Sequence, residues 1–276
     1  MDSLPPMAPS AASRSAVPVA LCLGGMDPSG GAGLLRDVMT LAALGVHPMA
    51  VCTAYTVQNG LACAAILPPP DPLPFLAALE PHLAGPGAWG VKLGLCRLET
   101  GSFSALIARV VALAPSARIW DPILAPSSGV GLHSAGQLRA MAGTLLGTGN
   151  WVVCPNLPEA QALAGPGAAG PMALAIPFLD LGASAVWLKG GHGAGAEVED
   201  FWITPGTVLG LGRCPRLPGD RRGTGCTLAS AWLAYRLLGL PGTEAALAAA
   251  RFLRDRWDPP VQPGGFGRPC FAPGAP

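Results

Sequence analysis

Short apolar runs alternate with amphipathic stretches along most of the chain. The apolar runs predict strands at residues 17–24, 46–55, 61–67, 89–93, 117–120, 151–154 and 185–188. Apolar residues at helical spacing predict helices at 34–44, 72–83, 99–113, 134–146, after Pro155, and at 171–181, 227–234 and 243–257. Residues 198–203 and 207–211 have the pattern of a hairpin. The alternation predicts an α/β fold, in which helices cover both faces of a parallel sheet.

The two ends of the chain differ in composition from its middle. Residues 1–16 are rich in proline, alanine and serine without a period, and we expect a disordered tail there. Residues 258–276 are rich in proline and glycine and are expected to be loose, with Phe266 and Phe271 as candidate anchors. No repeat or linker divides residues 17–257, which we expect to form one domain.

Composition and charge narrow the possible functions. Half of the 276 residues are apolar, and the net charge of +1 gives no electrostatic basis for binding nucleic acid or an anionic membrane. Residues 38–70 lack Asp, Glu, Lys and Arg, but Gly45, Pro48 and Asn59 interrupt them before about 20 apolar residues accumulate, so we expect no membrane span. There is no signal-peptide pattern, and the eight cysteines form no C-x-x-C pair, which favours reduced thiols in a cytoplasmic protein.

Polar residues interrupt the apolar pattern mainly where predicted strands end. They are Asp27, Gln58, Lys92, Asp121, Asn156, Glu159, Lys189 and the turn at residues 223–226. In open parallel sheets, ligands bind beyond the carboxyl ends of the strands. The shared position of these residues therefore predicts one site at that edge of the sheet.

The turn at residues 223–226, GTGC, opens a predicted helix. The free N–H groups and the dipole of a helix N-terminus attract anions, and Gly223 and Gly225 allow the backbone to approach a ligand closely. Cys226 falls in the first turn, where the pKa of a thiol tends to be lowered. The alternative is a tight turn before a packed helix, with Cys226 as a small buried hydrophobic residue.

Other polar positions suggest what such a site would do. Residues 24–33 contain five glycines but match neither dinucleotide-binding fingerprint, and we expect a ligand near their backbone. Lys92 lies in an apolar strand and needs a partner. Asn156 and Glu159 either serve a Mg²⁺ ion or cap a helix as its N-cap and N3 residues. Together with Lys189 beside a glycine pair, an anion-binding helix end and carboxylates for a metal indicate phosphoryl transfer.

Seven motifs occur in order at residues 25–33 (GMDPSGGAG, with Asp37 after it), 54–59 (AYTVQN), 91–94 (VKLG), 121–124 (DPIL), 155–159 (PNLPE), 189–192 (KGGH) and 223–227 (GTGCT). In these motifs the chain resembles the hydroxymethylpyrimidine/phosphomethylpyrimidine kinases of thiamine biosynthesis, which belong to the ribokinase-like superfamily. The resemblance extends from about residue 19 to 234. It implies a three-layer α/β/α fold with a mostly parallel central sheet.

The resemblance also implies an activity and roles for residues. The activity is ATP- and Mg²⁺-dependent phosphorylation of an aminopyrimidine alcohol and then of its monophosphate, by a cytoplasmic homodimer. The residues implied in substrate binding are Gly25, Asp37, Gln58 and Leu95. Those implied in binding ATP or its phosphates are Lys189, Thr224 and Asn156, and those implied in holding Mg²⁺, directly or through water, are Glu159 and Asn156. The implied catalytic residues are Gly223, Gly225 and Cys226, which form the anion hole, with Cys226 in the place of the aspartate base of related sugar kinases.

Three positions depart from the family pattern: Arg222 replaces a common histidine, Leu95 a frequent methionine, and Pro126 a frequent lysine or threonine. Pro126 removes a phosphate contact, and Arg222 is the candidate to restore the charge. These departures leave open the second phosphorylation and the ring substrate. The alternatives are a pyridoxal or pyridoxine kinase, disfavoured by Cys226, and a non-catalytic pyrimidine sensor, disfavoured by the intact Asn156/Glu159 pair and the 223–226 turn.

Overall fold

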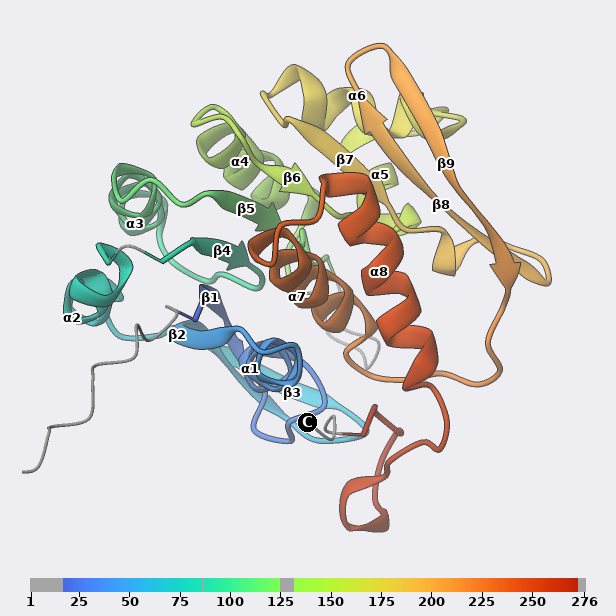
Figure 1. Ribbon diagram of the computed structural model, residues 1–276, viewed down its shortest axis with the longest axis horizontal. Coiled ribbons are helices and arrows are strands. Elements are labelled where there is room, and N and C mark those ends of the chain that lie inside the picture. The colour runs from blue at the N-terminus through green and yellow to red at the C-terminus, as the bar shows by residue number, and fades with distance from the viewer. Residues whose placement is uncertain (1–16, 86, 125–131, 273–276) are drawn as a thin grey trace, which may run out of the picture.

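A central sheet with helices on both faces organises the chain (Figure 1). The computed structural model describes residues 17–85, 87–124 and 132–272, so the predicted tail at residues 1–16 and Pro126 lie outside the described residues. Within this part the sheet has nine strands in the order β3-β2-β1-β4-β5-β6-β7-β8-β9. The strands are β1 Val19–Met26, β2 His47–Gln58, β3 Cys63–Leu67, β4 Trp89–Leu93, β5 Ala117–Trp120, β6 Val152–Val153, β7 Ala185–Leu188, β8 Glu197–Thr204 and β9 Thr207–Pro215.

The sheet is parallel in its centre and antiparallel at both ends. Strands β2, β1, β4, β5, β6 and β7 run parallel, whereas β3 pairs antiparallel with β2, and β8 and β9 add an antiparallel hairpin beyond β7. Successive strand residues face opposite sides, so Leu21 and Leu23 of β1 enter one core while Ala20 and Cys22 enter the other. Burial on both faces explains why the central strands are mostly apolar.

Two helical layers complete the fold. The helices are α1 Gly33–Ala43, α2 Leu73–Leu83, α3 Thr100–Ala112, α4 Ala135–Leu146, α5 Leu157–Ala164, α6 Pro171–Asp180, α7 Thr224–Leu237 and α8 Gly242–Asp255, with short 3₁₀ turns at Gly190–His192 and Pro263–Gly265. Helices α1, α7 and α8 share a core on one face of the sheet, in front of it in Figure 1, and α2 to α6 share the core on the other face. None of the described helices is both long enough and apolar enough to cross a membrane.

The predicted order of strands and helices is confirmed. One predicted boundary was wrong: the strand expected at residues 46–55 continues as β2 to Gln58. The reason is tertiary, because Thr56 pairs with Ile66 and Gln58 with Cys63 of the antiparallel strand β3. Cross-strand pairing thus extends a strand whose own residues give only a weak signal.

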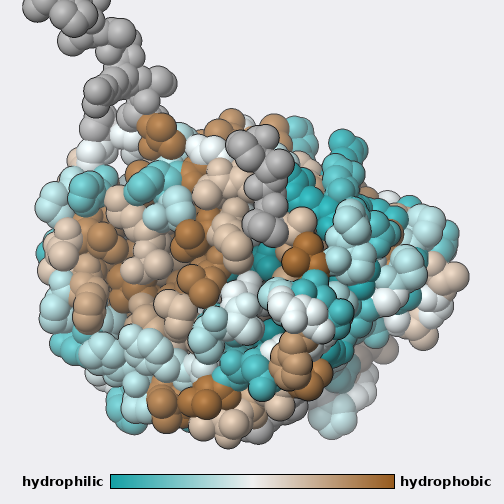
Figure 2. Space-filling model, turned by 90° about the horizontal axis from the view of Figure 1, so that it is seen from below, coloured by the Kyte–Doolittle hydropathy of each residue, from teal (hydrophilic) through white to brown (hydrophobic). Residues whose placement is uncertain are grey.

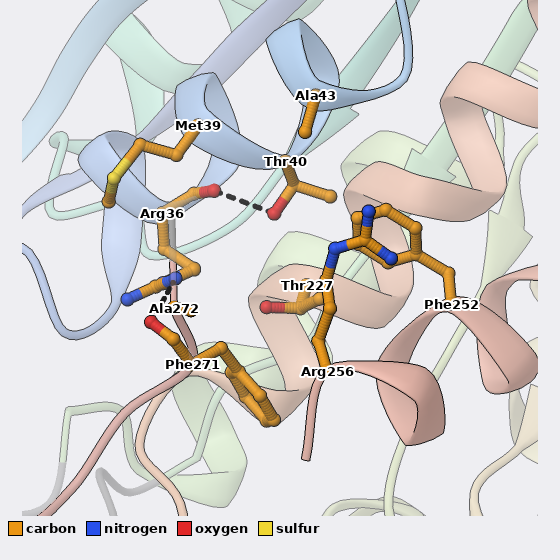
Figure 3. Close-up of a pocket in the computed structure, with 9 residues that line it drawn as sticks. All are labelled: Arg36, Met39, Thr40, Ala43, Thr227, Phe252, Arg256, Phe271 and Ala272. Atoms are coloured by element: carbon orange, nitrogen blue, oxygen red, sulfur yellow. Dashed lines mark hydrogen bonds between the residues drawn. The ribbon is translucent and has the colours of Figure 1, made fainter. Parts of the chain in front are cut away.

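The segment after α8 packs against the domain through Phe271. The ring of Phe271 is 2% exposed and lies 5.7 Å from that of Trp257, whereas Phe266 is exposed. The Arg36 guanidinium on α1 donates to the carbonyl oxygen of Phe271 at 3.3 Å (Figure 3). The space enclosed there, about 10 Å³, fits one water and no substrate. This contact closes the outer face of α1 and α7.

Candidate active site

Three buried ion pairs of the described chain gather where the parallel strands end. They are Lys92–Asp37 at 2.7 Å, Lys189–Asp121 at 2.8 Å and Arg222–Asp27 at 2.8 Å. Every one of these six side chains is at most 8% exposed. Buried charges need such partners, because an unpaired charge in a core is strongly destabilising. The pairs therefore fix the ends of the strands and loops around the N-terminus of α7.

The sequence predicted that Lys92 needs a partner in the core, and the structure shows that this partner is the carboxylate of Asp37. Lys92 Nζ donates to both carboxylate oxygens of Asp37, at 2.8 and 2.7 Å, and Ser230 Oγ on α7 donates to Oδ1 at 2.8 Å. Burial opposes the charged form of Lys92, but the attraction of Asp37 outweighs it and raises the pKa of the ammonium group. The carboxylate of Asp37, which the resemblance assigned to substrate binding, is 0% exposed and joins α1, β4 and α7.

The second pair brings Lys189 against the predicted anion-binding turn. Lys189 follows β7, and its Nζ donates to Oδ1 of Asp121, which follows β5. A Cβ atom at Gly225 would lie 3.2 Å from Oδ2 of Asp121 and 3.5 Å from Nζ of Lys189. The missing side chain at Gly225 thus lets the first turn of α7 approach this pair. Lys189 and Gly225, which belong to separate sequence motifs, lie together.

Helix α7 starts at a left-handed glycine. Gly223 has φ +80°, and a Cβ atom there would lie 2.3 Å from the carbonyl oxygen of Gly31 in the glycine-rich loop. No side chain caps this end, and the N–H groups of a first turn have no acceptor within the helix. Packing of the two glycine motifs against each other therefore leaves a helix end suited to an anion.

Arg222, expected to supply charge to a phosphate, is paired within the protein. Its guanidinium donates to Oδ2 of Asp27 at 2.8 Å and to Oγ of Ser29 at 2.7 Å. The N–H groups of Ser29 and Ala32 also donate to Asp27. Asp27 thus ties the loop at residues 27–32 to the residue before Gly223. Pro126, where the family frequently has a lysine or threonine, lies outside the described residues.

The expected fall in the pKa of the Cys226 thiol is contradicted. Burial raises the pKa of Cys226 to about 11, and the carboxylates of Asp37 and Asp121 add to this, while Lys92 and a backbone hydrogen bond from Gly33 act in the opposite direction. Cys226 is 6% exposed. Desolvation of the thiolate outweighs the effect of the helix N-terminus, because the first turn of α7 is packed under the glycine-rich loop.

Asn156 and Glu159 form a capping box at the start of α5, which confirms the capping alternative. The N–H of Glu159 donates to Oδ1 of Asn156 at 2.9 Å, and the N–H of Asn156 donates to Oε2 of Glu159 at 2.8 Å. Burial raises the pKa of Glu159 to about 7; Lys189 opposes this shift and Asp121 adds to it. Glu159 is thus a buried carboxyl within the electrostatic reach of the Lys189–Asp121 pair.

The side chains of Asn156 and Glu159 suit a magnesium ion only if other ligands complete its coordination. No group of three or more His, Cys, Asp or Glu side chains in the described ranges could hold a metal. One carboxyl and one amide, Glu159 and Asn156, suit a Mg²⁺ ion that is held mainly by phosphates and water, which is the usual way for this ion to bind. Beyond its capping bond, the amide oxygen of Asn156 keeps one lone pair, whereas the carboxyl of Glu159 also accepts from the backbone of Leu124.

The residues implied in substrate binding are in part brought together. A Cβ atom at Gly25 would lie 2.8 Å from Cδ2 of Leu95, so the end of β1 packs directly on that side chain. Leu95 is 5% exposed in a small cluster with Ala54 and Leu132. Gln58 is half-buried at the end of β2, the strand beside β1. Gly25 and Leu95 form one apolar contact, and Asp37 lies beside the preceding residue, since a Cβ atom at Gly24 would be 3.8 Å from its Oδ2.

Two supporting residues were missed by the sequence analysis. Asp200 on β8 accepts from the N–H of Gly190 at 2.8 Å and from Nε1 of Trp187 at 3.1 Å, which fixes the turn after Lys189. Ser230 completes the hydrogen bonding of Asp37. Ser230 lies four residues after Cys226, so helical spacing could have placed both on one face of α7. The role of Asp200 had no local signal, because a hairpin brings it back to the turn.

Replacing Glu159 with glutamine is expected to make the free energy of unfolding less dependent on pH between about 4.5 and 7. In this range the folded state keeps a proton on Glu159 that the unfolded chain releases, since the pKa rises from its ordinary 4.5 to about 7 on folding. The contribution of Glu159 to the free energy of unfolding is complete below pH 4.5, decreases as the pH rises and is lost above pH 7. The total change over this range is about 3 kcal/mol. Denaturant unfolding of both proteins across this range measures it. Equal pH slopes would contradict the raised pKa, and Glu197→Gln on the exposed hairpin is the control.

Solved structures place this architecture in a known class. The chain is similar to pyridoxal kinase from Staphylococcus aureus in complex with AMP-PCP, with a TM-score of 0.79 and 24% identity over 94% of this chain and 95% of that one. It is also similar to phosphomethylpyrimidine kinase from Clostridium difficile 630, with a TM-score of 0.69 and 25% identity over 87% of this chain and 99% of that one. The fold is therefore that of the ribokinase-like kinases, as expected.

The sequence comparison narrows this class to one family. The model of the phosphomethylpyrimidine kinase family matches residues 27–269. Hydroxymethylpyrimidine/phosphomethylpyrimidine kinase of Rhizobium meliloti (strain 1021) is 33% identical over 246 residues, which cover 85% of this chain and 88% of the relative. The chain belongs to the phosphomethylpyrimidine kinase family and is a phosphotransferase.

Proposed function

We propose that this chain transfers a phosphoryl group from ATP to 4-amino-5-hydroxymethyl-2-methylpyrimidine, and then to the resulting monophosphate, in thiamine biosynthesis. The observation that carries the proposal is the family match across residues 27–269. The geometry agrees with it, because an uncapped helix N-terminus lies against a buried lysine, as transfer between anions requires.

The phosphates are bound, in this proposal, by the first turn of α7 and by Lys189. Thr224 and the glycines at 223 and 225 offer backbone N–H groups, and Lys189 adds a positive charge that burial keeps from water. The similar pyridoxal kinase that binds AMP-PCP supports ATP as the donor. Mg²⁺ would neutralise the phosphate charges when bound, and Glu159 and Asn156 would hold it, directly or through water.

The pyrimidine ring is assigned to the apolar contact of Gly25 with Leu95 and to the side chain of Gln58. A ring resting on Gly25 needs the close backbone approach that glycine allows. Asp37 belongs to this group by resemblance, but its carboxylate already accepts from Lys92 and Ser230. We therefore assign it a positioning role: it holds the end of β4 against α1 and α7.

Cys226 acts by positioning the acceptor hydroxyl rather than as a thiolate. With a pKa of about 11, about one thiol in ten thousand is ionised at pH 7. Replacing Cys226 with serine, which is similar in shape and can also donate a hydrogen bond, is expected to keep kcat within about tenfold of the wild type. Steady-state rates across pH 6–9 measure this. A loss of 10²–10⁴-fold, the usual value of a general base, would contradict the positioning role.

The activity itself is tested by ADP release from the purified chain with MgATP. The substrates are hydroxymethylpyrimidine, its monophosphate and pyridoxal, with Cys226→Ala as the matched variant. Turnover of both pyrimidines supports the proposal, and turnover of the free alcohol alone confines the chain to the first step. Turnover of pyridoxal alone would make it a vitamin B6 kinase, and pyrimidine binding without ADP release would make it a sensor.

We also propose that the chain is a cytoplasmic homodimer joined along the β2–β3 edge. Tyr55, Val57 and Leu67 are 40%, 48% and 49% exposed there, and Tyr55 and Leu67 are directly paired across the two strands. Figure 2 shows hydrophobic residues gathered on the face that contains this edge. Exposed apolar surface of this kind is typical of interfaces. Sedimentation of the purified chain tests the oligomeric state.

A further inference from the structure

A hollow of about 390 Å³ lies at the end of the sheet opposite the candidate active site. Its lining includes Ala117, Val152 and Ala185, which stand at the starts of β5, β6 and β7. The active-site residues follow the other ends of these strands. The hollow is therefore separate from the candidate active site, and its volume falls within the usual range for small-molecule sites.

The charged residues that line the hollow are all cationic. They are Arg118 on β5 and Arg236 on α7, and no Asp or Glu side chain is among the lining residues. Arg118 is 9% exposed; Nη1 donates to the carbonyl oxygen of Gly149 at 3.0 Å, but Nε has no acceptor among the described residues. Burial lowers the pKa of Arg118, and no carboxylate of the described chain forms an ion pair with it.

Among the described residues, Arg118 shares this lack of a carboxylate partner with Arg36, which is also buried and donates only to carbonyl oxygens. The three buried cations at the other end of the strands each have a carboxylate partner. A buried guanidinium without a counter-charge is unfavourable, and an anion in the hollow would relieve that cost. A carboxylate or phosphate group is a suitable partner, because the planar guanidinium presents its donors to such oxygens.

An aromatic wall stands beside the two arginines. The indole rings of Trp202 and Trp232 are stacked at 6.2 Å with an interplanar angle of 23°, and both line the hollow. Nε1 of Trp232 donates to the carbonyl oxygen of Gly242, and its ring lies 5.9 Å from the Arg236 guanidinium. Trp202 is only half-buried, so it offers a flat apolar surface to a ligand.

We propose that this hollow is a second binding site, for a small organic anion whose carboxylate or phosphate group pairs with Arg118 and Arg236 while its flat ring lies against Trp202. Helix α7 joins this site to the candidate active site. Gly225 and Arg236 are 11 residues apart on it, about 16 Å along the axis. The site differs from the candidate active site in having arginines and tryptophans but no lysine along its lining.

The test is a titration followed through the indole N–H signals of the folded chain by NMR, with Trp202→Phe assigning the Trp202 signal. The probes are phenyl phosphate, benzoate, inorganic phosphate and phenol, each with and without ATP. We expect phenyl phosphate or benzoate to shift the Trp202 signal with a dissociation constant at least tenfold lower than that of phenol or inorganic phosphate. ATP should not displace either aromatic anion. Which of the two aromatic anions binds better decides between a phosphate ester and a carboxylate.

Arg118→Gln and Arg236→Gln provide the matched variants. Each is expected to weaken binding of the aromatic anion about tenfold while the kinase rate stays unchanged. Arg236 is only half-buried, so its variant keeps the test valid if Arg118→Gln fails to fold. The proposal would be overturned if phenol bound as tightly as phenyl phosphate, or if ATP competed with the aromatic anion. It would also be overturned if Arg236→Gln, and Arg118→Gln where that protein folds, bound the anion as tightly as the wild type.

Discussion

Replacing Gly223 with alanine is expected to lower kcat/KM by roughly 10²–10³-fold, the usual cost of losing one donor to a developing anion. The alanine Cβ would lie 2.3 Å from the carbonyl oxygen of Gly31, and Gly223 has a φ of +80° that alanine rarely adopts. The start of α7 must therefore move, and its N–H groups move with it. ADP release with the pyrimidine substrate measures the loss.

Gly206→Ala is the matched control for this change. Gly206, between β8 and β9, has a φ of +75°, but nothing lies within 4 Å of the position of its Cβ. It therefore has the same backbone strain, about 1–3 kcal/mol, without a clash and away from the site. We expect reduced stability and normal kinetics for Gly206→Ala. Equal rates in the two variants would show that the fit of Gly223 against Gly31 is not needed for catalysis.

Replacing Lys92 with methionine is expected to lower the free energy of unfolding by about 3–5 kcal/mol, because it leaves the carboxyl of Asp37, whose pKa burial already raises, without its main partner in the core. Both side chains are at most 1% exposed, so water cannot compensate. Denaturant unfolding measures the change. The exposed pair of Arg213 and Glu199 is the control: Arg213→Met should cost far less, because solvent screens that pair.

The double variant Lys92→Met/Asp37→Leu separates the ion pair from packing. If the cost of Lys92→Met comes from a stranded charge, removing the charge of Asp37 should recover most of the lost stability. Additive losses in the double variant would mean that the volume of the two side chains, rather than their charges, stabilises this part of the core. Activity should remain low in the double variant if Asp37 positions the substrate site.

The sequence by itself determined the order of the elements, the polar edge of the sheet and the family. Strand and helix periods are local properties, so β4, β5 and β7 have the predicted bounds. The positions of Gly223, Asn156 and Lys189 at element ends followed from the same pattern. The capping box also follows from spacing alone, since its residues are three apart on one helix.

Only the tertiary structure decided how these residues are paired and charged. The partner of Lys92 lies 55 positions away, and that of Arg222 lies 195 positions away, so neither could be found by spacing. The pKa of Cys226 rises because its helix end is packed under another glycine loop and faces two carboxylates from other elements. The cationic hollow likewise forms from the starts of three strands and the far end of α7. Burial and through-space charge depend on contacts between distant segments, which a local pattern does not contain.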